Sequence, residues 1–282
     1  MIISKKSYAF LTILLLFFFF LLVVVSMKLW FSKYEALGND FIIIDLRIPQ
    51  GGENFSIQDF ARKYCSRNFG IGADGVIGLY KPSDRNFDFK IRIINADGSE
   101  AEMSGNGIRC VAKYIYDMKL SDKDKITFET LAGKREVRRT QRGLEVNMGT
   151  PKILGKVKYD KFELFRVDVG NPHLVFLGDF DYELFINLAS KISKDENVNV
   201  EFAKIRSQNS IEVMVFERGV GETLACGTGA VAVFSVAQNE NLLKDEAEII
   251  FKGGKVLVSR KGDEFFIEGS ANFIFSGYVE IG

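Results

Sequence analysis

Cys226 lies in a glycine-rich segment, ERGVGETLACGTGAVAVF (217–234), that runs directly into an apolar stretch. Gly227 and Gly229 allow a tight turn and a close approach of the backbone to a ligand. A helix that follows the turn would direct its unpaired N–H groups and the positive end of its dipole at it. We therefore expect an anion-binding turn that favours the thiolate of Cys226 and lowers its pKa. The alternative is a buried cysteine that packs as a small apolar side chain.

The same pattern occurs a second time, in EMSGNGIRCVAKY (102–114). Aligning Ser104 with Cys226 also aligns the next three residues of each segment, Gly105–Gly107 and Gly227–Gly229, and an apolar stretch follows in both. Two copies of one turn–helix unit, well separated in the chain, indicate two related halves rather than a solenoid of short repeats. A substrate between two such helix N-termini would have a reactive side chain on each side. This arrangement suits chemistry that needs two opposed groups at one carbon.

Composition limits the classes of protein. The chain has 282 residues, 47% of them hydrophobic, which is enough for a large core and two domains. Its 37 basic and 37 acidic residues balance, so there is no electrostatic case for nucleic-acid binding. Cys65, Cys110 and Cys226 show neither a disulfide framework nor zinc-ligand spacing, and reduced thiols in a cytosolic enzyme fit best. No Walker-type loop is present, and the GIGADG run does not open an evident helix, so nucleotide binding carries little weight.

Residues 1–26 form a hydrophobic N-terminal extension of a different character. The apolar run AFLTILLLFFFFLLVVV follows Lys5 and Lys6 and has about the minimum length of a membrane span. One interpretation is a membrane anchor through residues 8–25, or an uncleaved signal segment. The other is that Met27 is the true start, which the clean beginning of a globular domain at Met27 favours. We therefore expect a cytoplasmic protein, with membrane anchoring as the alternative.

From Met27 onward the pattern predicts short strands with few helices. The serine of the capping box Ser56–Asp59 starts one helix, a second runs from Gly105 to about Lys119, and a third lies near 181–192. The segment 69–76 is a glycine-punctuated loop that leads into a short strand. Further strands are expected at 28–35, 41–47, 87–95, 125–131, 143–149, 163–169, 173–178, 211–218, 247–251, 255–259, 264–269 and 272–281.

The break at Gly149-Thr150-Pro151 predicts a domain border. We expect an N-terminal domain of residues 27–148 plus 270–282 and a C-terminal domain of residues 149–269. Each would be a mainly antiparallel sheet around a central helix. The predicted fold class is therefore α+β, with two similar, pseudo-symmetric α/β domains.

Six stretches resemble the diaminopimelate epimerase family, in the family's order and across nearly all of the chain after Met27. They are YEALGNDF (34–41), RNFGIGADGV (67–76), NADGSEAEMSGNGIRC (95–110), VGNPH (169–173), VNVEF (198–202) and ERGVGETLACGTGA (217–230). The resemblance implies interconversion of LL- and meso-2,6-diaminopimelate without cofactor or metal, on the route to lysine and peptidoglycan precursors. It also implies an active site in the cleft between two domains and, commonly, a homodimer.

By this resemblance, Cys226 and Ser104 occupy the catalytic positions. The family has a cysteine immediately before Gly-Asn-Gly, where this chain has Ser104. Cys110 does not replace it, because it would lie about a turn and a half into the helix, against the core. Serine is a far weaker acid than a thiol, although relatives in the wider proline racemase superfamily use a serine and cysteine pair. A natural serine–cysteine epimerase, a changed two-thiol enzyme and a protein that binds ligand but turns it over poorly all remain open.

The resemblance also assigns the surrounding residues. His173, the only histidine, would tune the cysteine pKa values together with Glu217, instead of being a satisfied surface or core histidine. Arg218 would bind the distal carboxylate with its planar guanidinium, and Glu217 would face an ammonium group. Gly75 cannot provide the ligand contact that a side chain makes in some members. The predicted substrate-binding residues are Asn39, Asn95, Gly105, Asn106, Asn171, Asn199, Glu217, Arg218, Gly227 and Thr228.

Two other functions are consistent with the sequence, as alternatives to diaminopimelate epimerase. One is another activity of the superfamily, such as hydroxyproline epimerase, although Arg218 and several asparagines favour a substrate with two charged ends. The other is a membrane-tethered binding protein without chemistry, suggested by Ser104 and the apolar N-terminus. This protein would be stabilised by its ligand but would not exchange a Cα proton.

Overall fold

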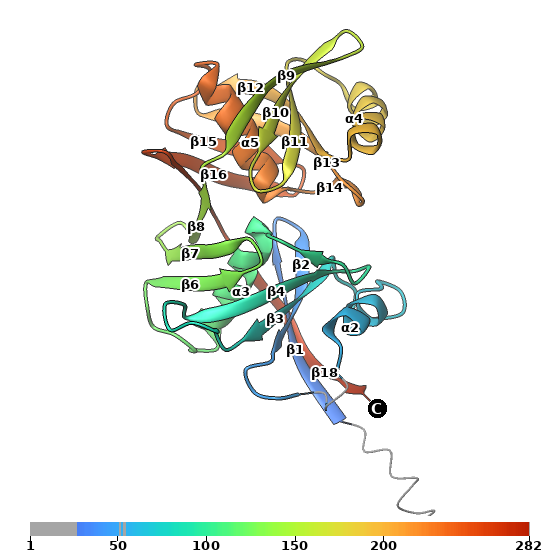
Figure 1. The fold of residues 1–282 in the computed structure, drawn as a ribbon, viewed down its shortest axis with the longest axis vertical. Helices are drawn as coiled ribbons and strands as arrows, with labels where there is room; N and C mark the ends of the chain where they lie inside the picture. Colours follow the sequence, from blue (N-terminus) through green and yellow to red (C-terminus); the bar gives the residue numbers. More distant parts are fainter. Residues whose placement is uncertain (1–26, 51, 53–54, 282) are drawn as a thin grey trace, which may run out of the picture.

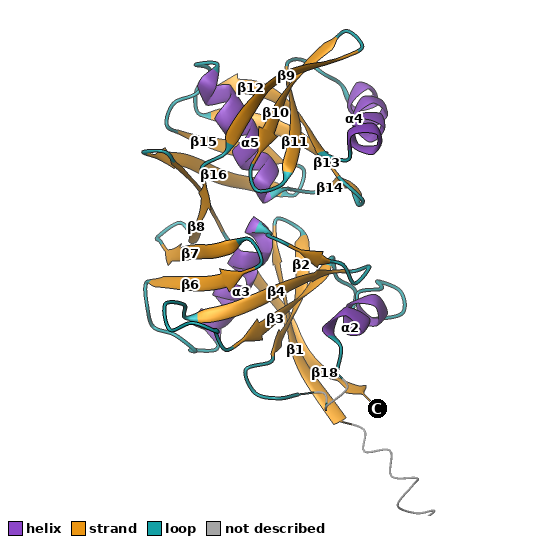
Figure 2. Ribbon diagram, viewed as in Figure 1, coloured by secondary structure: helices purple, strands orange, loops and turns teal. Residues whose placement is uncertain are grey.

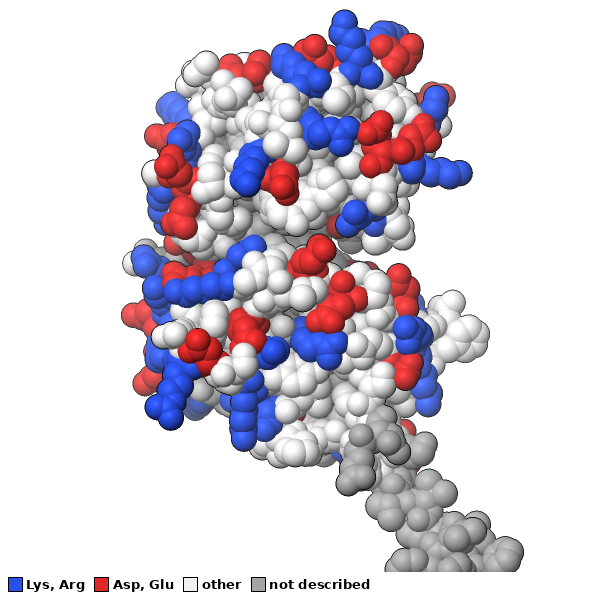
Figure 3. All heavy atoms as spheres, in the orientation of Figure 1, with Lys and Arg blue, Asp and Glu red and all other residues white. Residues whose placement is uncertain are grey.

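The computed structural model describes residues 27–50, 52 and 55–281, which form two lobes stacked along the long axis (Figure 1). The predicted N-terminal apolar run lies outside the described residues. Within these described ranges, no helix is long and apolar enough to cross a membrane. Basic and acidic side chains are interspersed over the visible face of both lobes (Figure 3), as the balanced composition predicts.

One lobe contains the N-terminal part of the chain and the last strand. Its elements are β1 (Met27–Ala36), β2 (Asn39–Asp45), α2 (Ile57–Tyr64), β3 (Gly75–Tyr80), β4 (Phe89–Asn95), β5 (Glu100–Ala101), α3 (Gly105–Asp117), β6 (Lys125–Thr130), β7 (Gly133–Arg139), β8 (Leu144–Gly149) and β18 (Asn272–Ile281). Strand β18 returns to pair antiparallel with β1 over nearly its whole length. The two ends of the described chain therefore lie side by side (Figure 1).

The other lobe contains the intervening elements. They are β9 (Lys152–Tyr159), β10 (Phe162–Asp168), β11 (Pro172–Leu177), α4 (Tyr182–Glu196), β12 (Asn199–Ser207), β13 (Ser210–Glu217), β14 (Gly221–Thr223), α5 (Gly227–Asn239), β15 (Glu246–Phe251), β16 (Gly254–Lys261) and β17 (Glu264–Gly269). Strands β8 and β17 pair antiparallel and join the two sheets.

The two lobes repeat one strand topology, which confirms the predicted pseudo-symmetric α+β fold. The pairs β1–β2 and β3–β4 are antiparallel, whereas β2–β3 and β4–β6 are parallel. The second lobe has the same order: β10–β11 and β12–β13 are antiparallel, and β11–β12 and β13–β15 are parallel. Position by position, β2 therefore corresponds to β11, β3 to β12, and α3 to α5.

Each lobe is built around a central helix, α3 or α5, while α2 and α4 pack on the outside (Figure 2). Every residue of α5 from Gly227 to Ala237 is buried. A helix that is apolar on all sides must be enclosed by protein, because each large apolar side chain contributes about 1.5–3 kcal/mol on burial. This enclosure fixes the direction of both helix axes and so the places where their N-termini lie.

The helices begin where the sequence predicts them. Ser56 caps α2, and its side chain accepts a hydrogen bond from the Asp59 N–H at 3.2 Å. The strands β7, β9 and β12 were not predicted. Strand β7 is mostly charged with a single buried side chain, Val137, and β9 is largely exposed, so neither has a clear hydrophobic period. Pairing with β6 and β10 stabilises them.

Candidate active site

The N-termini of α3 and α5 meet between the two lobes. A Cβ atom added to Gly227 would lie 3.2 Å from the Cα of Gly105, and one added to Gly105 would lie 3.5 Å from the Cα of Gly227. Both glycines are the first residues of their helices and neither has a positive φ. Their role is therefore to let two backbones approach each other, and not to allow a left-handed turn.

Ser104 and Cys226 are the N-cap residues of the two facing helices. The Ser104 Oγ accepts a hydrogen bond from the Gly107 N–H at 3.0 Å, and the Cys226 Sγ accepts one from the Gly229 N–H at 3.3 Å. Both residues have extended backbone, with φ of −145° and −128°. N-cap geometry thus holds both side chains at the positive ends of the helix dipoles.

Cys226 is buried, and burial shifts the pKa of its thiol in the direction opposite to the predicted one. Burial raises the pKa of the Cys226 thiol well above its usual value, and the nearby carboxyls of Glu217 and Glu201 raise it further. Hydrogen bonds from the Thr228 hydroxyl and the Gly229 N–H act in the opposite direction but are the smaller effects. The predicted lowering of this pKa was wrong, because a helix N-terminus does not compensate for removing the thiolate from water.

Glu217 lies at the end of β13 beside this thiol. It accepts a hydrogen bond from the Thr223 Oγ1 at 2.6 Å. Burial raises the pKa of Glu217 above its usual value, against the effect of that hydrogen bond. A buried carboxyl group with a raised pKa is a candidate for a general acid or base.

His173 is fully buried, and its hydrogen-bond partners are Glu201 and Asn171, not Glu217. Its Nδ1 lies 2.8 Å from the Glu201 Oε1, and its Nε2 lies 2.9 Å from the Asn171 Oδ1. The Asn171 Nδ2 donates to the Thr228 Oγ1 at 3.3 Å, and this hydroxyl lies 3.3 Å from the Cys226 Sγ. The histidine thus connects to the thiol through Asn171 and Thr228.

Glu201 was not predicted as a site residue, although it lies within the VNVEF stretch (198–202). A signal was present, because a carboxylate in an otherwise buried strand needs a partner. The side chain is 0% exposed, and its Oε2 has no hydrogen-bond partner among the described residues.

On the Ser104 side, two amides and a buried guanidinium take the place of the carboxyl and imidazole groups. The Asn106 Nδ2 donates to the Asn39 Oδ1 at 3.3 Å and to the Ala225 carbonyl oxygen at 3.4 Å, so this side chain spans the two lobes. Its Oδ1 accepts a hydrogen bond from the Arg109 Nη2 at 2.8 Å. Arg109 is fully buried, was not predicted as a site residue, and has its pKa lowered to about 10 by burial.

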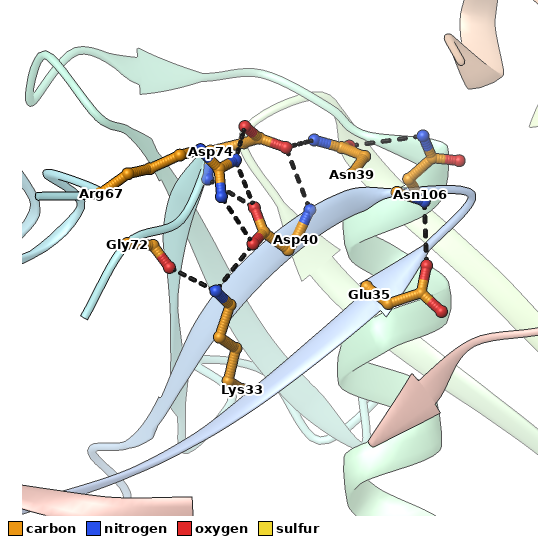
Figure 4. A network of polar contacts seen from close by, with 9 residues as sticks. Lys33, Glu35, Asn39, Asp40, Arg67, Gly72, Asp74 and Asn106 are labelled. Carbon is orange, nitrogen blue, oxygen red and sulfur yellow. Dashed lines mark hydrogen bonds and ion pairs between the residues drawn. The ribbon is translucent and has the colours of Figure 1, made fainter. Parts of the chain in front are cut away.

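Asn39 is positioned by a network of charged side chains (Figure 4). The Asn39 Nδ2 donates to the Asp74 Oδ2 at 2.7 Å, and Asp74 pairs with Arg67 at 2.6 Å. Arg67 also pairs with Asp40 at 2.9 Å, and Asp40 pairs with Lys33 at 2.8 Å. Burial alone would raise the pKa of Asp40, but hydrogen bonds from Arg67 and Lys33 outweigh it and lower the pKa.

Three further predicted substrate-binding residues are Asn199, Arg218 and Asn95. The Asn199 Oδ1 accepts a hydrogen bond from the Arg218 backbone N–H at 2.9 Å. The Arg218 guanidinium is exposed and forms no ion pair with any other described residue. Asn95 is exposed at the end of β4 and donates from Nδ2 to the Ser99 Oγ at 3.0 Å.

Two negative expectations concern Cys110 and Gly75. Cys110 is 0% exposed in the core face of α3, and burial raises the pKa of its thiol, so it does not replace the missing cysteine. A Cβ atom at Gly75 would lie 2.6 Å from the Ile94 carbonyl oxygen. The backbone therefore requires glycine at position 75, which explains why no ligand-binding side chain is present there.

Comparisons with known proteins agree with this architecture. The family model described as diaminopimelate epimerase matches residues 31–154 and 165–274. The diaminopimelate epimerase of Carboxydothermus hydrogenoformans is 37% identical and covers 88% of this chain and 98% of its own length. The diaminopimelate epimerase of Caldanaerobacter subterraneus subsp. tengcongensis is 39% identical, with coverages of 89% and 99%.

Solved structures show the same fold at low identity. A hydroxyproline epimerase from Agrobacterium vitis with bound trans-4-OH-L-proline superposes with a TM-score of 0.70 at 12% identity, covering 90% of this chain and 93% of that one. A Bacillus anthracis phenazine biosynthesis protein of the PhzF family gives a TM-score of 0.67 at 16% identity, covering 90% of this chain and 99% of that one. At such identities, the likeness shows the fold alone.

Proposed function

The chain belongs to the diaminopimelate epimerase family, and from this premise we propose that Cys226 and Ser104 carry out its reaction from opposite sides of one carbon. The protein is an isomerase that interconverts LL- and meso-2,6-diaminopimelate. Two N-cap side chains at facing helix N-termini, one from each lobe, are the observation that supports this assignment.

In one direction, the Cys226 thiolate removes the Cα proton while the Ser104 hydroxyl donates a proton to the opposite face. In the other direction the roles exchange, so the Cys226 thiol donates and the Ser104 oxygen accepts. The N–H groups at Gly105–Asn106 and Gly227–Thr228 would stabilise the negative charge that develops on the substrate carboxylate. No cofactor is assigned a part in this scheme.

The proposed substrate contacts fall into two groups. Asn39, Asn171 and the two helix N-termini surround the reacting end. Arg218, held at its backbone by Asn199, would bind the distal carboxylate with its free guanidinium. Glu217 and Asn95 are the last residues of the equivalent strands β13 and β4. We assign Glu217 to an ammonium group of the substrate, and we assign the Asn95 amide to a hydrogen bond with one of its amino-acid ends.

The decisive experiment measures exchange of the Cα proton for deuterium in D₂O with LL-diaminopimelate, meso-diaminopimelate and hydroxyproline. We expect exchange with both diaminopimelate epimers. Exchange confined to hydroxyproline would contradict the proposed substrate. Stabilisation by diaminopimelate without any exchange would instead indicate a binding protein.

The same assay on Ser104→Cys tests the role of the serine. A thiol loses its proton far more readily than an alcohol, so we expect the exchange rate to rise by about a hundredfold. Ser121→Cys, away from the facing helix N-termini, is the control and should leave the rate unchanged. A rate for Ser104→Cys at or below that of the unaltered chain would contradict the assignment of residue 104.

We propose that the protein is a homodimer formed through β1 and β18. Their outer face exposes Trp30 at 57%, Phe273 at 51% and Tyr278 at 44%, an apolar strip that a second copy would cover. Sedimentation velocity should show a dimer for the unaltered chain and a monomer for the Trp30→Glu variant. A monomeric unaltered chain would contradict this part of the proposal.

The domain division of 27–148 plus 270–282 and 149–269 and a cytoplasmic location also remain proposals. Antibody detection of the protein in fractionated cells tests the location. Recovery in the membrane fraction would favour an anchor through residues 8–25.

A further inference from the structure

The two lobes have different pairs of buried side chains near their proposed catalytic residues, Ser104 and Cys226. In the parallel pair β2–β3, Phe41 is opposite Gly75, and in the equivalent pair β11–β12, His173 is opposite Asn199. His173 therefore corresponds to Phe41. The correspondence extends to the next inward-facing positions on β12 and β3.

Those positions are Glu201 and Ile77. A Cβ atom on Gly229 of α5 would lie 2.6 Å from the Glu201 Oε1, and one on Gly107 of α3 would lie 3.2 Å from the Ile77 Cδ1. The C-terminal lobe thus buries a carboxylate and an imidazole where the N-terminal lobe buries an isoleucine and a phenylalanine. Because the apolar pair builds the same fold, the charged pair is not required for folding, and burying it is costly.

The hydrogen bonds around His173 have a definite direction. Its two ring nitrogens face two acceptors, the Glu201 Oε1 and the Asn171 Oδ1, so both are placed to donate a hydrogen bond. Since the Asn171 oxygen accepts from His173, its NH₂ group donates to the Thr228 Oγ1. The Thr228 hydroxyl proton is then free to point at the Cys226 Sγ, 3.3 Å away.

We propose that Glu201 and Thr228 are positioning residues at the two ends of a directional hydrogen-bond chain that stabilises the Cys226 thiolate. The inference rests on the proposed function only in taking Cys226 as the acid–base group. Glu201 accepts a hydrogen bond from the His173 Nδ1, the His173 Nε2 donates to the Asn171 oxygen and so orients this amide, and Asn171 leaves the Thr228 hydroxyl able to donate.

Other charges also face this thiol. Glu217 approaches from β13 and Glu201 from β12, and Glu201 is bonded to His173 of β11. Helix α3 presents the uncharged Gly105 and Asn106 to the same turn, and both accept hydrogen bonds from Arg109 behind them. The two carboxyls oppose the thiolate, as does burial. Two donors, the Thr228 hydroxyl and the Gly229 N–H, therefore have to stabilise it.

The hydrogen-bond chain from Glu201 to Cys226 predicts the effect of the substitution Glu201→Gln. With an amide in place of the carboxylate, the His173 Nδ1 donates to the oxygen of the new side chain, and the Nε2 is left to accept a hydrogen bond. Asn171 then turns its NH₂ group to His173 and its oxygen to Thr228, which donates to Asn171 instead of to Cys226. The Glu201→Gln substitution should therefore act on the thiol in the same way as removing the Thr228 hydroxyl.

The experiment measures the rate at which iodoacetamide alkylates Cys226, followed on the peptide that contains it, from about pH 6 to about pH 10, because the thiolate is the reacting form. Peptide mapping separates this signal from that of Cys65 and Cys110. We expect Thr228→Val to slow alkylation about tenfold at a given pH, which corresponds to a rise of about one unit in the pKa of Cys226. Thr228→Ser keeps the hydroxyl and should restore the rate.

Glu201→Gln should slow alkylation to a similar extent, and the double variant Glu201→Gln/Thr228→Val should be no slower than Thr228→Val alone. Glu212→Gln, on β13 and paired with Arg206, is the matched control and should not change the rate. Unchanged alkylation in Thr228→Val would overturn the proposal, and so would fully additive effects in the double variant. Because alkylation needs no substrate, loss of Cα exchange in the unaltered chain would contradict the proposed function and leave this test intact.

Discussion

The N-termini of α3 and α5 are built on one plan but equipped differently. Both helices start with an N-cap side chain that accepts a backbone N–H, and both first residues are glycines in mutual contact. Near Cys226 lie the buried residues His173 and Glu201, whereas the helix start at Ser104 has Asn106, which accepts a hydrogen bond from the buried Arg109. The same turn–helix unit is therefore present twice, but only the copy at Cys226 is surrounded by carboxyl and imidazole groups suited to acid–base chemistry.

Charge serves another purpose in the N-terminal lobe. There the ion pairs of Lys33, Asp40, Arg67 and Asp74 surround the loop that holds Asn39, and they are paired with each other instead of facing the reactive hydroxyl. We therefore expect substitutions in this network to affect stability first. Substitutions beneath Cys226 should affect reactivity first.

The largest expected difference is between Cys226→Ala and Ser104→Ala. Removing the thiol should lower the rate of Cα exchange by about a thousandfold or more, because it removes the stronger acid–base group. Removing the hydroxyl should cost about tenfold or less, since serine without a base is a poor proton carrier. The rates are measured by deuterium incorporation on both diaminopimelate epimers.

Cys110→Ala is the control for loss of a buried thiol, and it should keep its exchange rate while losing some stability. Equal losses in Cys226→Ala and Ser104→Ala would show that the two helix N-termini contribute equally to the reaction.

Asp40→Asn tests the structural charges. Asp40 is 10% exposed and lies between Lys33 and Arg67, so losing its charge should lower the free energy of unfolding by about 3 kcal/mol at neutral pH. The pKa of Asp40 is depressed in the folded state. Its contribution is therefore complete above the unfolded pKa of about 3.9 and is lost as the pH falls through the folded value.

Chemical unfolding at a series of pH values measures this effect. The difference between the unaltered chain and Asp40→Asn should shrink as the solution is acidified. Asp122→Asn, at an exposed position, should show no such difference at any pH. A constant difference across the acid range would mean that the charge of Asp40 does not contribute through Lys33 and Arg67.

The smallest expected effects come from the glycine contact. A methyl group at Gly227 would lie 3.2 Å from the Gly105 Cα, so Gly227→Ala should separate the helix N-termini slightly and slow exchange about tenfold. Gly105→Ala meets its nearest atom, the Met148 Cε, at 3.4 Å and should be milder. Exchange rates and thermal unfolding of both variants provide the measurement, and a larger loss in Gly105→Ala would reverse this ranking.

Local sequence patterns predicted much of the fold. Three helices were predicted from the capping serine at position 56 and from the apolar stretches after Gly105 and Gly227. The repeated SGNG and CGTG segments predicted two similar halves. Strands β7 and β9 were missed because their residues are largely charged or exposed. Such strands form only because a neighbouring strand is available for pairing.

What the sequence determined by itself is where helices start, which residue types cap them and which family the motifs resemble, because these depend on residues close together in the chain. Only the tertiary structure decided that burial and two carboxyls raise the pKa of Cys226. It also decided that Glu201, and not Glu217, contacts His173. Desolvation and charge act through space, and the paired His173 and Glu201 come from strands that place them 28 residues apart along the chain.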